Sequence, residues 1–270
     1  MSWRANFDKN GYAVIENLYT VDEVSEMKRE INRLITEIDL DQQPKSVFLT
    51  YDENQHAADE YFMNSSDKIR VFFEEGALDG EGSLIVEKHR ALNKIGHGLH
   101  ICNPVFKRMT FHHKLKQLFK DLQYNEPKVV QSMYIFKQPK IGGAVTDHID
   151  STFLYVEPIE HLTGVWIAID DANEENGCLA FIPGSHKRTL VDYRFVRTHK
   201  TDGSALLKFT GSRSALLIHG LVVHKSATNT SSNSRHAYTF HVMEAKNTKW
   251  SEDNWLQETP TYKFPALYDN

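Results

Sequence analysis

The 270-residue sequence contains only two cysteines, Cys102 and Cys178. Two thiols cannot form the disulfide framework of a small secreted domain, so we expect a reducing, cytoplasmic location. No apolar run reaches the roughly 18 residues of a membrane span, and the first residues lack the basic-then-apolar order of a secretory leader. The last residues match no lipidation or retention signal. We therefore expect no membrane partner.

An excess of basic charge is also missing. The net charge is −5, so composition does not favour a nucleic-acid partner. Hydrophobic residues make up 40% and charged residues 25%, which is typical of a globular protein. No internal repeat, low-complexity tract or linker-like break interrupts the chain. These absences predict a single globular domain over residues 1–270.

Residues 1–125 have mainly helical patterns. Apolar residues recur at spacings of three and four from Val21 to Ile38, and Thr20 is a suitable N-cap for this helix. Asn103 and Pro104 predict the N-cap and first residue of a helix that continues to about residue 119. The other expected elements are a strand over 11–16, a loop over 41–59 and a short helix over 67–75.

From residue 126 to about 250, short segments rich in β-branched and aromatic residues alternate with turn signals. Strands are expected over 129–136, 147–156, 164–170, 177–182, 205–209, 215–218 and 237–243. Many short strands with regular turns predict a β-sandwich or jelly roll. We expect a mainly β fold with flanking α-helices, in which the N-terminal helices pack on the outer face of the β core.

His148 and Asp150 lie two residues apart on an expected strand, so both side chains would point to the same face. A His-x-Asp pair is expected about once by chance in such a sequence, and alone it is weak evidence. His224, after a later strand, would complete a set of two histidines and one carboxylate, which suits non-haem Fe(II) and O₂ chemistry. His219 is the alternative third ligand, although it could equally be a turn histidine bonded to the backbone beside Gly220.

Arg235 follows His224 by eleven residues and opens the strand over 237–243. A guanidinium fork pairs with a carboxylate through two parallel hydrogen bonds. At this place it could hold the far carboxylate of a 2-oxoacid whose other end chelates the metal. A single arginine at a strand start is more often a surface ion pair, but the ordered set of His-x-Asp, distal histidine and arginine is much rarer.

This ordered set resembles that of the Fe(II)/2-oxoglutarate-dependent dioxygenases of the phytanoyl-CoA dioxygenase family. The resemblance extends over nearly the whole chain and is carried by segments 7–16, 93–97, 130–136, 175–179 and 181–186. It implies a double-stranded β-helix core, a cupin-like jelly roll, over residues 126–250. The helix-rich residues 1–125 would pack on this core within the same domain.

The resemblance also implies the site residues. His148, Asp150 and His224 would hold Fe(II) as metal ligands and catalytic residues, and would also contact the co-substrate 2-oxoglutarate. Arg235 would bind its distal carboxylate with the help of Ser226. The remaining implied co-substrate contacts are Lys94, Met133 and Trp166.

Two of these contacts can also be judged from the sequence pattern. Strand alternation over 164–170 places Val165, Ile167 and Ile169 on one face and Trp166 on the other, although a strand tryptophan is more often plain core. By pattern, Lys94 is only a solvated lysine, so its role rests on the resemblance. His186, in the turn over 183–186, is expected to form hydrogen bonds outside the metal set.

The implied reaction consumes 2-oxoglutarate and O₂, releases succinate and CO₂, and hydroxylates an unidentified small-molecule or acyl substrate. Halogenases of this fold replace the carboxylate ligand by a small residue, so Asp150 favours hydroxylation. The alternative is a non-catalytic metal- or ligand-binding jelly-roll module, which would not need Arg235.

The substrate is least defined by the sequence. Basic residues at 137, 140, 188, 194, 197 and 200 could clamp a CoA-linked substrate, or they could simply be solvated. The segment 187–204 could also be a lid over a smaller ligand. The chain ends in Leu267-Tyr268-Asp269-Asn270 and not in a peroxisomal signal. We therefore expect a cytosolic metabolite other than phytanoyl-CoA.

Overall fold

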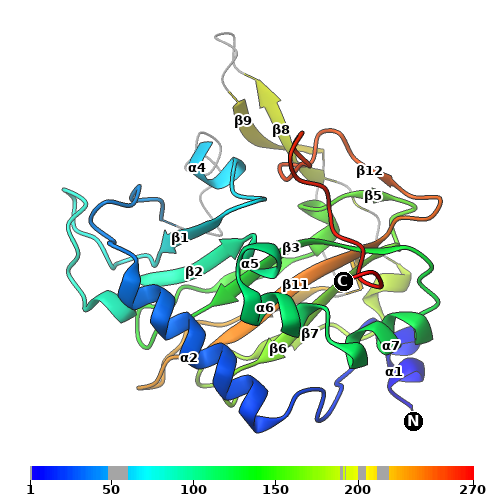
Figure 1. The fold of residues 1–270 in the computed structure, drawn as a ribbon, viewed down its shortest axis with the longest axis horizontal. Helices are drawn as coiled ribbons and strands as arrows, with labels where there is room; N and C mark the ends of the chain where they lie inside the picture. Colours follow the sequence, from blue (N-terminus) through cyan, green and yellow to red (C-terminus); the bar gives the residue numbers. More distant parts are fainter. Residues whose placement is uncertain (1, 48–59, 189–190, 192, 200–204, 212–218) are drawn as a thin grey trace.

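The computed structural model describes residues 2–47, 60–188, 191, 193–199, 205–211 and 219–270 (Figure 1). Its helices are α1 (Trp3–Asn10), α2 (Val21–Glu37), α4 (Glu60–Met63), α5 (Leu99–Cys102), α6 (Pro104–Thr110) and α7 (His113–Asp121), with 3₁₀ turns η1 (Lys88–Arg90), η2 (Asp150–Thr152) and η3 (Ser185–Lys187). Its strands are β1 (Ile69–Phe73), β2 (Leu92–His97), β3 (Pro127–Ile135), β4 (Val145–His148), β5 (Val156–Glu157), β6 (Leu162–Ala168), β7 (Leu179–Phe181), β8 (Tyr193–His199), β9 (Ala205–Gly211), β10 (His224–Ser226), β11 (Ala237–Glu244) and β12 (Lys249–Trp250).

Two antiparallel sheets form the β core. The main sheet has five strands in the order β1-β2-β3-β11-β6, and the smaller sheet has three in the order β4-β10-β7. Strands β12 and β5 form a small two-stranded sheet, and β8 pairs with β9. In the main sheet, β11 lies between β3 and β6, two strands that are distant from it in sequence, as expected for a jelly roll. Among the described residues, no helix has the length and apolar character needed to cross a membrane.

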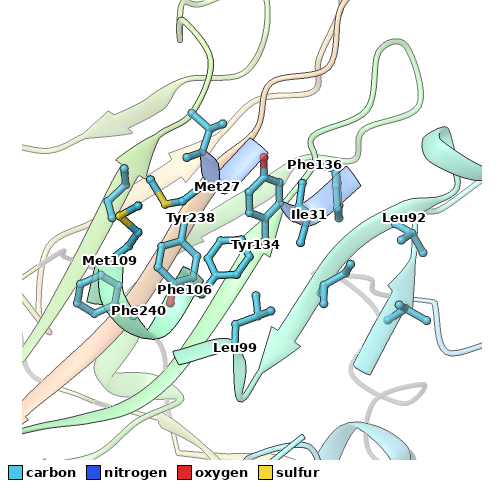
Figure 2. Packing of buried hydrophobic residues seen from close by; sticks show 14 of the residues in the cluster. Met27, Ile31, Leu92, Leu99, Phe106, Met109, Tyr134, Phe136, Tyr238 and Phe240 are labelled. Carbon is cyan, nitrogen blue, oxygen red and sulfur yellow. The ribbon is translucent and has the colours of Figure 1, made fainter. Parts of the chain in front are cut away.

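Helix α2 begins as its sequence predicts. The Glu23 amide donates to Thr20 Oγ1 at 3.2 Å, and the Thr20 amide donates to Glu23 Oε2 at 2.8 Å, which forms a capping box. The buried stripe of this helix consists of Met27, Ile31 and Ile35. Figure 2 shows Met27 and Ile31 in one cluster with aromatic side chains of the main sheet. The apolar residues of α2, which recur at helical spacing, therefore pack on one face of the main sheet.

The strand alternation of β11 separates this core from the opposite face of the main sheet. Tyr238, Phe240 and Val242 belong to the cluster under the helices. Thr239 and His241, between them in sequence, line a cavity on the other face. Period-two patterning thus gives the main sheet one apolar face for the helices and one face for a site.

Several local predictions were wrong. Residues 69–73 form strand β1 and not a helix, because the β-branched and aromatic run of this segment pairs with β2, a strand that the sequence analysis did not identify. Residues 11–16 form no strand. The helix expected from Pro104 to residue 119 is two helices, because Phe111 ends α6 and the His112 ring accepts a hydrogen bond from the Lys114 amide to start α7.

The expected strand over 147–156 is also divided. Strand β4 ends at His148, the turn η2 follows from Asp150, and β5 starts at Val156. Part of the segment 187–204, considered above as a lid, forms strand β8, which pairs with β9. The predicted strand over 215–218 lies outside the described residues, as does most of the loop over 41–59.

Candidate active site

A cavity of about 260 Å³ lies between the two sheets. Strands β2, β3, β6 and β11 of the main sheet line one side, and β4, β7 and β10 line the other. Every residue predicted for the site lines this cavity: His148, Asp150, His224, Arg235, Ser226, Lys94, Met133 and Trp166. The fold therefore brings together residues that are up to 141 positions apart, from Lys94 to Arg235.

His148, Asp150 and His224 form one cluster whose ligand atoms lie within 4.8 Å of one another. Pairing of β10 with β4 places His224 directly opposite His148. Asp150 was expected on the same strand as His148, but it lies at the start of the turn η2. Its Oδ1 lies 3.8 Å from His148 Nε2 and 3.9 Å from His224 Nε2. The three side chains can therefore hold one divalent metal through Nε2, Nε2 and Oδ1.

Both histidines are oriented by their own backbone. The Nδ1 of His148 lies 2.8 Å from the Thr146 carbonyl, and the Nδ1 of His224 lies 3.0 Å from the Val222 carbonyl. A carbonyl only accepts, so Nδ1 carries the proton and Nε2 keeps its lone pair for a metal. Burial lowers the pKa of His148 to about 4, which keeps the ring neutral and able to act as a ligand.

Asp150 is surrounded by imidazoles. Burial opposes its charge, but the electrostatic effects of His241, His224 and His148 outweigh it, and the pKa of Asp150 lies well below its usual range. The third ring, His241, was not singled out in the sequence. Its Nε2 lies 3.2 Å from Asp150 Oδ2. Its only sequence signal is a polar position on the cavity face of a strand whose opposite face carries Tyr238, Phe240 and Val242.

Arg235 is buried at the end of the cavity, with 2% of its surface exposed. Its Nη2 donates to the Gly177 carbonyl at 2.9 Å and to Ser226 Oγ at 3.4 Å. Its guanidinium carbon lies 5.2 Å from the centre of the Trp166 ring. Burial lowers its pKa to about 10, so it stays charged at neutral pH. Its Nε and Nη1 have no acceptor among the described residues, so a buried cation keeps donors for an anionic ligand.

The other predicted co-substrate contacts lie in register. Thr239 of β11 pairs with Met133 of β3 on one side and with Trp166 of β6 on the other. Trp166 faces the cavity, whereas Val165 and Ile167 contact the helix-covered core. The sequence pattern indicated a solvated lysine at position 94, but Lys94 is buried, with 6% of its surface exposed. Burial lowers its pKa to about 7, opposed by the charge of Glu74.

The cavity also has a polar group of residues that the sequence analysis missed or placed elsewhere. Glu74 accepts hydrogen bonds from Asn93 Nδ2 at 3.2 and 3.1 Å, and burial raises its pKa. Lys137 donates to the Gly143 carbonyl at 2.6 Å, and burial lowers its pKa to about 8. A row of aromatic side chains forms the apolar wall: Phe62, His97, Phe153, Phe195 and Trp255.

The alternative histidines lie away from the cluster. His219 packs near His186, with ring centres 5.1 Å apart, and the His219 amide donates to the Gly11 carbonyl at 2.9 Å. The Nε2 of His186 lies 3.2 Å from the carbonyl oxygen of Asp8. Neither histidine lines the cavity. Both have structural contacts with the N-terminal helix region.

The basic residues do not form a common clamp among the described side chains. Arg194 pairs with Asp253 and lies over the Tyr155 ring at 4.0 Å. Lys137 is inside the cavity, and Lys140 donates to the Thr230 carbonyl. Lys200 and the side chain of Arg197 lie outside the described part of the chain. The described basic side chains of this set therefore lie apart, each with its own contacts.

Taken together, the fold and site define a jelly-roll protein with a His-Asp-His cluster in its cavity. The sequence model of the Phytanoyl-CoA dioxygenase (PhyH) family matches residues 7–237, and the chain belongs to this family. It is 63% identical to the phytanoyl-CoA dioxygenase domain-containing protein 1 homolog of Caenorhabditis elegans, with 98% of each chain covered. It is 45% identical to phytanoyl-CoA dioxygenase domain-containing protein 1 of Bos taurus, over 97% of this chain and 96% of that one. The family resemblance drawn from the motifs is confirmed.

Solved structures share the fold. The epimerase SnoN, in complex with Fe³⁺, alpha ketoglutarate and nogalamycin RO, superposes with a TM-score of 0.60 at 14% identity, covering 98% of this chain and 97% of that one. EctD from S. alaskensis, with 2-oxoglutarate and 5-hydroxyectoine, gives a TM-score of 0.60 at 16% identity, covering 99% and 86%. The predicted fold class, a cupin-like jelly roll with flanking helices, is confirmed.

Proposed function

We propose that the chain is an Fe(II)- and 2-oxoglutarate-dependent dioxygenase that hydroxylates a small molecule. The observation that carries this proposal is the combination, in one cavity, of the His148–Asp150–His224 cluster with a buried Arg235 that keeps two unpartnered donors. The cluster suits a facial Fe(II) site with three open positions. Arg235 suits the second carboxylate of a diacid. SnoN and EctD, which share the fold, were crystallised with iron or 2-oxoglutarate, which is consistent with this pairing.

The protein residues would divide the work by position. Bound Fe(II) would supply, with 2-oxoglutarate and O₂, the oxidative decarboxylation that yields succinate, CO₂ and a hydroxylated product. Arg235 and Ser226 would hold the far carboxylate of 2-oxoglutarate, while Trp166 and Met133 would flank its carbon chain. Lys94 would add positive charge at the same end. Because Arg235, Ser226 and Lys94 are buried, they also exclude water from the reacting atoms.

The substrate would bind at the aromatic wall. The Phe62 and Trp255 rings stack at 4.4 Å, and His97 lies 5.0 Å from Trp255. Phe153 lies 6.0 Å from the His148 ring and so connects this wall to the metal ligands. The group to be oxidised is therefore apolar. Without a phosphate clamp among the described residues, we propose a substrate other than phytanoyl-CoA, and efficient 2-hydroxylation of that compound would refute this part.

The decisive experiment measures CO₂ release from 1-labelled 2-oxoglutarate with Fe(II) and O₂. The rate is compared with that of the Asp150→Ala variant. This variant should lose turnover and weaken metal binding while its melting temperature stays close to wild type, because apolar packing holds the fold. If the wild-type protein binds 2-oxoglutarate and metal but never decarboxylates, the chain is a binding module and not a dioxygenase.

A further inference from the structure

Two cavity residues outside the predicted set, His241 and Gln131, stand in one row across the main sheet. His241 pairs in register with Gln131 on β3 and with Gly164 on β6. Gln131 Nε2 lies 3.1 Å from His241 Nδ1, and His241 Nε2 lies 3.2 Å from Asp150 Oδ2. A chain of three polar side chains therefore connects the main sheet to the turn that carries the carboxylate of the metal cluster.

The chemistry of the three side chains determines which atom donates and which accepts in each hydrogen bond. The Asp150 carboxylate only accepts hydrogen bonds, so His241 donates through Nε2. In the neutral ring Nδ1 is then an acceptor, and it faces the amide nitrogen of Gln131, which only donates. His241 is 6% exposed and Gln131 is 5% exposed, so water does not compete for these contacts. Asp150 thus fixes the tautomer in which His241 donates through Nε2, and the Gln131 amide complements it by donating to Nδ1.

The two oxygens of Asp150 have different surroundings. Oδ1 faces the Nε2 atoms of His148 and His224, whereas Oδ2 is the atom bonded to His241. Gly164 leaves room for the close approach. A Cβ atom there would lie 3.2 Å from Asp150 Oδ2, closer than nine in ten Cβ contacts, so the carboxylate would have to shift by a few tenths of an ångström. The sheet is therefore shaped to admit this hydrogen bond.

We propose that His241, oriented by Gln131, is a positioning residue that holds Oδ2 of Asp150 and leaves Oδ1 for the metal. The inference rests on the proposed function for the presence of a metal at the cluster. Without the hydrogen bond, the carboxylate can rotate about its terminal torsion, which is a soft one. Binding a metal would then require ordering the carboxylate as well, and groups that orient a metal ligand in this way typically change affinity by about 10- to 100-fold.

The test compares metal binding in His241→Leu and His241→Gln, measured by anaerobic calorimetry with Fe(II) and by titration with Co(II), whose visible spectrum reports coordination. His241→Leu should lower the affinity about 10- to 100-fold and alter the Co(II) spectrum. His241→Gln keeps an amide donor near the Nε2 position and should recover most of the affinity. Gln131→Met, which removes the orienting amide but leaves His241, should give an intermediate loss.

His100→Leu is the matched control. His100 is also a buried histidine with both ring nitrogens in contact, at 2.9 Å with Ser132 Oγ and 3.2 Å with the Tyr262 hydroxyl, but it does not line the cavity. The His100→Leu substitution should lower the melting temperature without changing metal affinity. If His241→Leu fails to fold, the metal affinities of His241→Gln and Gln131→Met, compared with that of the wild-type protein, still test the role of His241.

Wild-type metal affinity and an unchanged Co(II) spectrum in folded His241→Leu, or in both milder variants, would overturn the proposal. These measurements use no 2-oxoglutarate. A wild-type protein that binds metal but does not turn over would therefore refute the proposed dioxygenase function and leave the role of His241 readable. A wild-type protein that binds no metal would refute both.

Discussion

Replacement of Arg235 by lysine keeps a positive charge in the cavity but removes the planar fork. In the wild-type protein Nη2 is occupied by the Gly177 carbonyl and Ser226 Oγ, and Nε and Nη1 have no acceptor among the described residues. The guanidinium can thus bind a carboxylate while it stays anchored. A lysine ammonium at the same place would have to give up either the anchor or the ligand.

The expected magnitude follows from that geometry. One charge-assisted hydrogen bond to a buried carboxylate is worth about 1.5–3 kcal/mol. Since about 1.4 kcal/mol corresponds to a factor of ten, the Kd of 2-oxoglutarate in Arg235→Lys should rise roughly 10- to 100-fold. Metal affinity in the absence of 2-oxoglutarate should not change, because the three metal-binding side chains are untouched.

The assay is calorimetric titration of 2-oxoglutarate into the anaerobic Fe(II)-loaded protein. Arg188→Lys is the matched control, since Arg188 lies exposed after η3 and does not line the cavity. It should leave the Kd unchanged. An unaltered 2-oxoglutarate Kd in folded Arg235→Lys would remove Arg235 from the co-substrate site, whereas a parallel loss of metal affinity would indicate a general disturbance of the cavity.

Two further outcomes are expected. Burial lowers the pKa of Lys94 to about 7, so the side chain loses its charge as pH rises through neutrality, and the affinity for the 2-oxoglutarate dianion should fall over that range. The pKa of Lys137 is lowered less, to about 8, so Lys137 would account only for a later part of the pH profile. In Lys94→Met the affinity at pH near 6 should therefore drop, and the first part of the pH dependence should disappear. A wild-type profile in that variant would exclude Lys94 from the site. Ile31 is fully buried under the main sheet, so Ile31→Ala should lower the free energy of unfolding by about 2–5 kcal/mol without changing metal affinity. Val21→Ala, at an 82% exposed position of the same helix, should change it by less than about 0.5 kcal/mol, and equal effects of the two substitutions in denaturant titrations would contradict the packing described for α2.

The sequence by itself determined the features that depend on local pattern. The capping residues and apolar period of α2 and the alternation of β6 follow from interactions between residues close in the chain. The series of short strands and turn signals predicted a β-sandwich or jelly roll, and the family resemblance narrowed this to the jelly roll. The order His148, Asp150, His224, Arg235 was also readable, because rare residue types at set spacings stand out even without a structure. The alternation of β6 alone placed Trp166 on the face away from Val165.

Tertiary structure decided what depends on partners distant in sequence. Residues 69–73 became a strand because β2 offers a pairing edge, and no local signal reports that edge. Lys94 was placed in the cavity, and its pKa lowered, by burial between the sheets, although its sequence context is that of a solvated lysine. Gln131 contacts His241, and His241 reaches Asp150, because the register aligns three strands and Gly164 leaves space beside the carboxylate. Such contacts depend on packing between residues distant in sequence, so they can be identified only from the folded structure.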